Sequence, residues 1–132
     1  MIVVDSSALI AVLEGEPEAL AFVVELARAE RLFVSAVSVL ETGMVLRARR
    51  GDGAIEDLRT FLFVDNDFEV VPFDQALAES ALAAFSRFGK GINPRARLNL
   101  GDCATYALAK AMDLPLLFKG DDFTSTDVRR VR

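Results

Sequence analysis

The sequence predicts an α/β fold with a mainly parallel central sheet of four to five strands flanked by helices. Short aliphatic runs alternate along the chain with longer segments of helical periodicity, an order typical of strand–helix–strand units. The aliphatic runs are almost continuously apolar, as expected for strands covered on both faces. With 132 residues, of which 52% are hydrophobic, the chain has the length and apolar content expected for a single domain over residues 1–132.

Strands are expected at the runs rich in β-branched residues, leucine and phenylalanine, namely 2–5, 32–35, 68–71 and 114–118. A fifth, short edge strand is expected near 128–131. Helices are expected where apolar residues recur with helical spacing, namely at 6–13, 17–29, 37–50, 54–63, 73–88 and 100–112. Pro17 suits the first turn of its helix, and Gly51 suits the end of the third helix. The glycine- and proline-containing basic segment 89–97 is expected to be an irregular loop.

The composition limits the chemistry that this chain can perform. It contains no histidine, which excludes Ser-His-Asp and Cys-His catalytic groups and histidine-bound zinc. Its single cysteine, Cys103, excludes an intrachain disulfide and a cysteine-type zinc site, and a buried packing role is expected for it. An enzyme of this composition must therefore use carboxylates, hydroxyls, basic side chains, a cofactor or a metal ion bound by oxygen.

Charge and hydropathy indicate where the protein acts. The net charge of −5 is not typical of a general nucleic-acid-binding protein, although basic residues cluster locally. No apolar run approaches the roughly 18 residues that a membrane span needs, and the first residues lack the pattern of a secretory signal. We therefore expect a cytoplasmic protein with no membrane partner.

Five acidic residues stand at the ends of predicted elements or among apolar neighbours: Asp5, Glu41, Asp102, Asp121 and Asp122. Each has a structural explanation when taken alone. Asp5 and Asp102 suit helix caps, Glu41 suits a solvated helix surface, and the last two acids suit a turn. The neighbours of Glu41, including Leu40 and Met44, look buried, which counts against a solvated position.

Taken together, these acids favour a shared site. The first and fourth strands are expected to be neighbours, and the carboxyl ends of adjacent parallel strands form one crevice. Several carboxylates in a small space raise one another's pKa unless a cation compensates their charge, and Mg²⁺ and Mn²⁺ suit such oxygen ligands. A metal ion held in this way activates a water for attack on phosphorus, which permits phosphodiester hydrolysis without histidine.

Three segments, MIVVDSSALIAVL, SAVSVLETGMVL and NLGDCATYALAKAMDLPLLFKGDDF, resemble the PIN-domain ribonucleases, and more specifically the VapC-type toxins of bacterial toxin–antitoxin pairs. The resemblance covers the whole chain, and its last segment is the most specific. It implies a PIN-like three-layer fold and an Mg²⁺-dependent endoribonuclease, with Mn²⁺ as a substitute ion. The implied substrate is structured RNA, such as a tRNA or a ribosomal RNA loop. The implied partners are a second copy of the chain in a homodimer and a cognate VapB-type antitoxin. Toxin and antitoxin are also implied to form higher assemblies.

The resemblance assigns catalysis to four acidic residues, Asp5, Glu41, Asp102 and Asp121. Asp5 and Asp102 match the metal ligands, whereas Ser7 and Asn99 match polar residues that support the site. The sequence departs from the family pattern at the fourth acid, because Lys119 and Gly120 stand where an aspartate usually follows the strand. Asp121 is therefore the candidate, and a supporting or structural role is expected for Asp122.

Basic residues near these acids are expected to contact RNA phosphates, which fix the position of the RNA without reading its sequence. They are Arg47, Arg50, Lys90, Arg95 and Arg97. For the two arginines at the end of the Glu41 helix, complementing the helix C-terminus is the alternative role.

Two other interpretations remain open. A haloacid-dehalogenase-like phosphatase also begins with a hydrophobic strand that ends in aspartate, but it normally has a second acid two residues later, where this chain has Ser7. A catalytically inactive PIN-like module would only bind RNA or a partner protein. The acids at positions 5, 41 and 102 count against that module.

Overall fold

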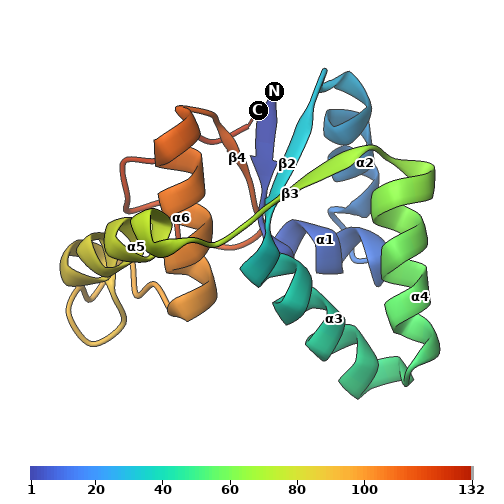
Figure 1. Cartoon of the computed structure of the whole chain (residues 1–132), viewed down its shortest axis with the longest axis horizontal. Helices are drawn as coiled ribbons and strands as arrows, with labels where there is room; N and C mark the ends of the chain where they lie inside the picture. Colours follow the sequence, from blue (N-terminus) through green and yellow to red (C-terminus); the bar gives the residue numbers. More distant parts are fainter. Residues whose placement is uncertain (132) are drawn as a thin grey trace.

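The computed structural model describes residues 1–131 and contains a four-stranded sheet in which all strands run parallel, in the order β3-β2-β1-β4. The strands are β1 (Ile2–Val4), β2 (Leu32–Ser35), β3 (Phe68–Val71) and β4 (Leu116–Leu117). The predicted α/β class is confirmed, and β1 and β4 are neighbours as expected. Figure 1 shows the sheet between two groups of helices.

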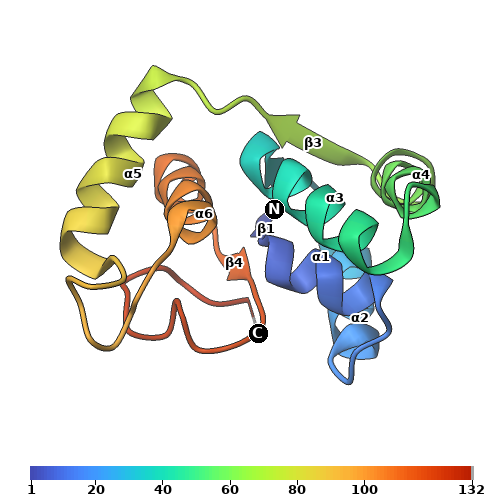
Figure 2. The same cartoon turned by 90° about the horizontal axis from the view of Figure 1, so that it is seen from below.

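The helices of the described residues are α1 (Ser6–Leu13), α2 (Ala19–Arg28), α3 (Ala36–Arg50), α4 (Gly53–Thr60), α5 (Gln75–Phe88) and α6 (Leu100–Met112). Alternate strand residues face opposite sides of the sheet. Val3 and Phe33 pack into a core with α5 and α6, whereas Val4 and Val34 pack into a core with α1, α2 and α4. Figure 2 shows these two groups of helices apart, with the strands between them, as a three-layer fold requires. None of the helices formed by residues 1–131 combines the length and hydropathy of a bilayer-spanning segment.

Helix α3 follows β2 directly and lies across the carboxyl edge of the sheet, where it contacts α1, α4 and α6. Ser35 caps its start by accepting a hydrogen bond from the backbone N of Val37 at 3.1 Å. Gly51 ends it with φ +86°, a conformation that favours glycine. These two boundaries carry α3 from the sheet edge toward α4.

The buried face of α3 differs from the expectation. Its fully buried residues include the polar Ser38 and Thr42, whereas Leu40 and Met44 are 64% and 63% exposed. The expectation that these apolar neighbours of Glu41 are buried is therefore wrong. Ser38 faces α6, where its Oγ lies 3.0 Å from Thr105 Oγ1, and Leu46 is the large apolar residue that α3 buries.

Several predicted boundaries move because local hydrogen bonds set them. Helix α2 begins at Ala19 rather than Pro17, since a turn closes from Ala19 N to the Glu16 carbonyl at 2.9 Å. Helix α5 begins after Asp74, whose side chain caps it. Helix α4 ends at Thr60 and continues as a π-helical turn over Phe61–Asp65. The expected strand at 128–131 is reduced to a single parallel bridge that joins Arg130 to Leu116.

Candidate active site

Asp5 lies at the carboxyl end of β1 and is almost fully buried. Its Oδ2 accepts a hydrogen bond from the backbone N of Ser7 at 3.0 Å, which caps α1, and its Oδ1 accepts one from Thr105 Oγ1 at 2.7 Å. Burial raises the pKa of Asp5, while the hydrogen bonds from Ser7 and Thr105 oppose that rise. Asp5 is thus a helix cap, as its sequence position suggested, and also a carboxylate tied to α6.

Asp102 lies in the first turn of α6, where it forms a reciprocal capping box with Asn99. Asp102 N donates to Asn99 Oδ1 at 2.9 Å, and Asn99 N donates to Asp102 Oδ2 at 3.1 Å. Burial raises the pKa of Asp102 to about 7 against the Asn99 hydrogen bond, and the charges of Asp5, Asp122 and Glu41 raise it further. Acids from three other segments of the chain therefore act on Asp102.

Glu41 approaches these aspartates from α3. Ser6 Oγ donates to its Oε1 at 2.7 Å, which joins α3 to the start of α1. A Cβ added to Gly101 would lie 2.5 and 2.7 Å from the two oxygens of the Glu41 carboxylate. Gly101 therefore makes room for the third acid beside Asp102. This role of Gly101 was not predicted from the sequence, in which the Gly-Asp step of α6 was the available signal.

The two aspartates in the segment after β4 contribute in different ways. Both Asp121 and Asp122 are exposed. The backbone carbonyl of Asp121 accepts hydrogen bonds from Thr124 and so closes a turn. The charge of Asp122 reaches Asp102, as its effect on the Asp102 pKa indicates. Of these two aspartates, Asp122 is thus the one whose charge acts on Asp102.

Lys119 stands where the family pattern has an acid. Its backbone N donates to Ser7 Oγ at 3.0 Å, which joins the end of β4 to α1. Its Nζ forms ion pairs with Glu16 Oε1 at 2.8 Å and with Glu18 Oε1 at 3.4 Å, both in the segment before α2. Ser7 is therefore bonded both to Asp5 and to the strand beside it.

The predicted basic residues fall into two groups. At the end of α3, Arg47 pairs with Asp52 at 3.1 Å, and Arg50 pairs with Glu14 at 3.3 Å and with Asp57 at 3.5 Å. The loop between α5 and α6 carries the other group, Lys90, Arg95 and Arg97, for which residues 1–131 provide no carboxylate within salt-bridge distance. A hollow of about 440 Å³ in this loop is lined by Lys90 and Arg97 among others.

Cys103 is buried beside Asp102, as the sequence suggested. Burial, and then the charge of Asp102, raises the pKa of its thiol to about 11. The thiol is therefore protonated at neutral pH, which does not suit a nucleophile.

The fold and this group of carboxylates define a class of protein. The family model described as PIN domain matches residues 2–129, and the chain belongs to the PIN-domain family. Within that family it groups with the VapC ribonucleases. It is 43% identical over 128 residues to ribonuclease VapC28 of Mycobacterium tuberculosis, a match that covers 97% of this chain and 96% of the relative.

Solved structures share the fold at low sequence identity. The toxin VapC20 of Mycobacterium tuberculosis, described as cleaving the sarcin-ricin loop, superimposes with a TM-score of 0.82 at 18% identity, covering 100% of this chain and 99% of that one. One chain of the VapBC2 complex of Rickettsia felis, which is bound to a fragment of promoter DNA, superimposes with a TM-score of 0.73 at 11% identity, covering 100% of this chain and 98% of that one. These likenesses concern the fold.

Proposed function

We propose that this VapC ribonuclease is a metal-dependent endoribonuclease toxin that hydrolyses phosphodiester bonds of structured RNA, such as a tRNA or a ribosomal RNA loop. The observation that carries the proposal is that Asp5 and Asp102 are buried at the carboxyl edge of the sheet and that the Glu41 carboxylate lies against Gly101, the residue before Asp102. Burying several carboxylates together is unfavourable unless a cation offsets their charge. Its relationship to named ribonucleases over almost the whole chain supports the same activity.

The donor set suits a hard divalent ion. Asp5 and Asp102 are the ligands we assign, and Mg²⁺ is usually held by one or two carboxylates together with waters and substrate phosphate oxygens. No group of three acidic or cysteine side chains within residues 1–131 is close enough to hold an ion alone. Bound Mg²⁺, or Mn²⁺ in its place, would activate a water and stabilise charge on the attacked phosphate.

The chain's own residues then have distinct tasks. Hydrogen bonds from Ser7 and Thr105 orient the Asp5 carboxylate, and the Asn99 capping box orients Asp102. We assign to Glu41, held through Oε1 by Ser6, the acceptance of a hydrogen bond from the attacking water. In-line attack on phosphorus would leave 5′-phosphate and 3′-hydroxyl ends.

The fourth acidic position is assigned here to Asp122. Its charge acts on Asp102, whereas Asp121 contributes a backbone carbonyl to the turn. The earlier assignment of this role to Asp121 stays a prediction. Cleavage assays of Asp121→Asn and Asp122→Asn side by side separate the two, since the acid that serves the site gives the larger loss.

The loop cations are the RNA contacts we favour. Lys90, Arg95 and Arg97 precede Asp102 along the chain and form no ion pair with a carboxylate of residues 1–131. Arg47 and Arg50 are already paired with acids on their own side of the molecule. An RNA phosphate would therefore displace no protein partner at the loop.

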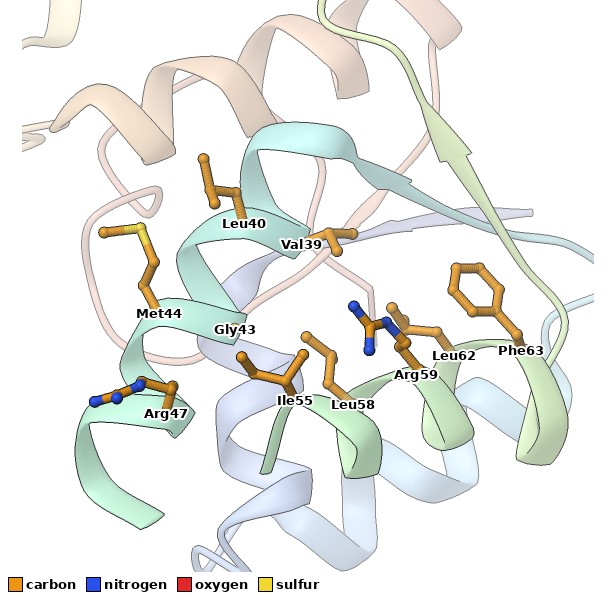
Figure 3. Close-up of a pocket in the computed structure, with 10 residues that line it drawn as sticks. All are labelled: Val39, Leu40, Gly43, Met44, Arg47, Ile55, Leu58, Arg59, Leu62 and Phe63. Atoms are coloured by element: carbon orange, nitrogen blue, oxygen red, sulfur yellow. The ribbon is translucent and has the colours of Figure 1, made fainter. Parts of the chain in front are cut away.

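An antitoxin is the partner proposed for the exposed side of α3. A mainly apolar groove of about 350 Å³ runs between α3 and α4, and Figure 3 shows Leu40 and Met44 from α3 with Ile55 and Phe63 from the α4 side. Leu40 and Met44 also line a second hollow beside Glu41. A chain seated in the groove would thus reach the acidic site, where a basic side chain would meet the carboxylates.

A homodimer is proposed through the face formed by α5 and the start of α6. Exposed apolar residues of α5 and α6, with the segment before them, surround a hollow of about 350 Å³ and include Phe73, Leu82, Phe85 and Leu100. Exposed apolar surface of this kind is typical of a contact between proteins. Sedimentation of the wild type and of Leu82→Glu tests it, because a charge in that hollow would shift the protein toward monomer.

The central experiment uses protein freed of any antitoxin. It should cleave RNA in Mg²⁺ or Mn²⁺, lose cleavage in EDTA, and lose cleavage in Asp5→Ala. Undiminished cleavage in EDTA or by Asp5→Ala would contradict the mechanism. RNA binding without cleavage by the wild type in either metal would favour the inactive binding module.

A further inference from the structure

A chain of buried hydroxyl groups lies against Asp5, on the opposite side of its carboxylate from the Ser7 cap. Thr105 Oγ1 lies 2.7 Å from Asp5 Oδ1 and 3.0 Å from Ser38 Oγ. Thr105 is 1% exposed and Ser38 is 0% exposed. Both groups are therefore shielded from substrate, and any effect they have on the reaction must pass through Asp5.

The direction of these hydrogen bonds follows from counting protons. A hydroxyl has one proton, and Thr105 donates its proton to Asp5. At the next contact, Ser38 must therefore be the donor and Thr105 the acceptor. Ser38 thus donates to Thr105, and Thr105 donates to Asp5. We call these two hydrogen bonds the hydroxyl relay, in which Ser38 holds Thr105 with its proton directed at the carboxylate.

Helix propensity does not explain why Ser38 and Thr105 stand within helices. Serine and threonine are weaker helix formers than alanine, and a buried hydroxyl is costly without a partner. Helical threonines often bond the carbonyl four residues earlier, as Thr42 does with Ser38 O at 2.7 Å. Thr105 instead bonds a side chain 100 residues away in the sequence. The partner that accounts for Thr105 is therefore Asp5.

We propose that Thr105 and Ser38 are positioning residues that fix the Asp5 carboxylate for metal binding; this rests on the proposed function, in which Asp5 is a ligand. Ser7 N holds Oδ2 from α1, and Thr105 holds Oδ1 from α6, so the carboxylate cannot rotate freely about its Cβ–Cγ bond. A carboxylate has about four lone pairs, which leaves acceptor capacity on both oxygens for an ion. Partners that orient a ligand from behind typically change metal affinity by about 10- to 100-fold.

The test is Mn²⁺ binding by the full chain, followed by the electron paramagnetic resonance signal of the free ion. Thr105→Val should weaken binding by about 10- to 100-fold, since it keeps the shape and removes the donor. Thr105→Ser keeps a hydroxyl and should bind within about threefold of wild type. Ser38→Ala should weaken binding by less than Thr105→Val, because it removes only the second hydrogen bond of the relay.

Thr42→Val is the matched control. Thr42 is equally buried, but its hydroxyl bonds only a backbone carbonyl, so Mn²⁺ affinity should match wild type. Equal weakening in Thr42→Val and Thr105→Val would overturn the proposal, because general loosening of the core would explain both. Thermal unfolding in EDTA establishes that each variant is folded. If Thr105→Val does not fold, wild-type affinity in Ser38→Ala overturns the proposal.

A parallel titration of Asp5→Asn separates the two levels of inference. If Asp5→Asn weakens Mn²⁺ binding but Thr105→Val binds as the wild type does, the positioning role of Thr105 is contradicted and the role of Asp5 as a metal ligand is supported. Wild-type binding in Asp5→Asn would instead overturn the proposed role of Asp5 as a ligand.

Discussion

The carboxylate of Glu41 lies in the space that a side chain at Gly101 would occupy. A Cβ at position 101 would come within 2.5 to 2.8 Å of the Oε1, Oε2 and Cδ atoms of Glu41. Because Gly101 immediately precedes Asp102, the same glycine brings an acid of α3 next to an acid of α6. The close approach of two helices at one glycine thus sets the spacing of the candidate site.

Gly101→Ala should therefore impair cleavage without unfolding the protein. The displaced atoms are the far end of a flexible side chain, so Glu41 can move away, and a misplacement of about 1 Å can cost about a hundredfold in rate. RNA cleavage rates and thermal unfolding measure the two effects. Gly53→Ala is the control, since Gly53 also stands in the first turn of a helix but has no atom within 4 Å of an added Cβ. Equal cleavage by both variants would contradict the role of Glu41.

The stability of the metal-free protein should depend on Asp102. Burial raises its pKa from 3.8 to about 7 in the folded state. Between these pH values the folded chain keeps a proton that the unfolded chain loses. The free energy of unfolding should therefore fall, by up to about 4 kcal/mol, as the pH rises from about 4 through 7. Burial also raises the pKa of Asp5, which acts in the same direction.

Asp102→Asn should flatten that pH dependence and raise stability at pH 8 in EDTA, because it removes the repulsion and keeps an oxygen that can accept from Asn99 N. Denaturant unfolding at several pH values measures the change. A large loss of stability in this variant would mean that the charged carboxylate matters mainly as a helix cap.

Asn99→Ala should lower both stability and activity. It removes the side chain that caps α6, at a cost of about 1 kcal/mol, and so loosens the first turn of α6, in which the backbone N of residue 99 donates to Asp102 Oδ2. Asp74→Ala removes a comparable cap from α5, where Asp74 Oδ1 accepts from Leu77 N at 2.9 Å. Unfolding and cleavage measured together should show similar stability losses but reduced cleavage only for Asn99→Ala. Full activity in Asn99→Ala would contradict the role of the Asn99 cap in orienting Asp102.

The loop cations should govern the salt dependence of RNA binding. Lys90→Ala and Arg95→Ala should each weaken binding and reduce the slope of log affinity against log salt by about one, if each contacts one phosphate. The measurement is RNA affinity of a metal-free Asp5→Asn background across salt concentrations. Arg28→Ala is the control, since Arg28 is exposed on α2 and paired with Glu25. An unchanged slope in the loop variants would show that RNA phosphates are bound by another surface of the protein.

Much of the fold could be predicted because its signals are local. Apolar runs and helical spacing located the strands and helices of a parallel α/β sheet, and β1 was correctly expected beside β4. The absence of histidine and the positions of Asp5, Glu41 and Asp102 directed attention to carboxylate chemistry. These features depend on residue type and spacing, which the sequence states directly.

Other features depended on which segments pack together, and no local pattern contains that information. The tertiary structure decided that α3 buries Ser38 and Thr42 and exposes Leu40 and Met44, and that Ser38 meets Thr105 of α6, 67 residues later in the chain. It also decided that Gly101 gives room to Glu41, and that Asp122 acts electrostatically on Asp102.

The sequence by itself therefore determined the class of fold and the chemical type of the site. The tertiary structure alone decided how the acids are held, since the bond from Thr105 to Asp5 joins residues 100 positions apart. Hydrogen bonds of 2.7 to 3.0 Å require a geometry that only the packing of α1, α3 and α6 around the sheet edge creates.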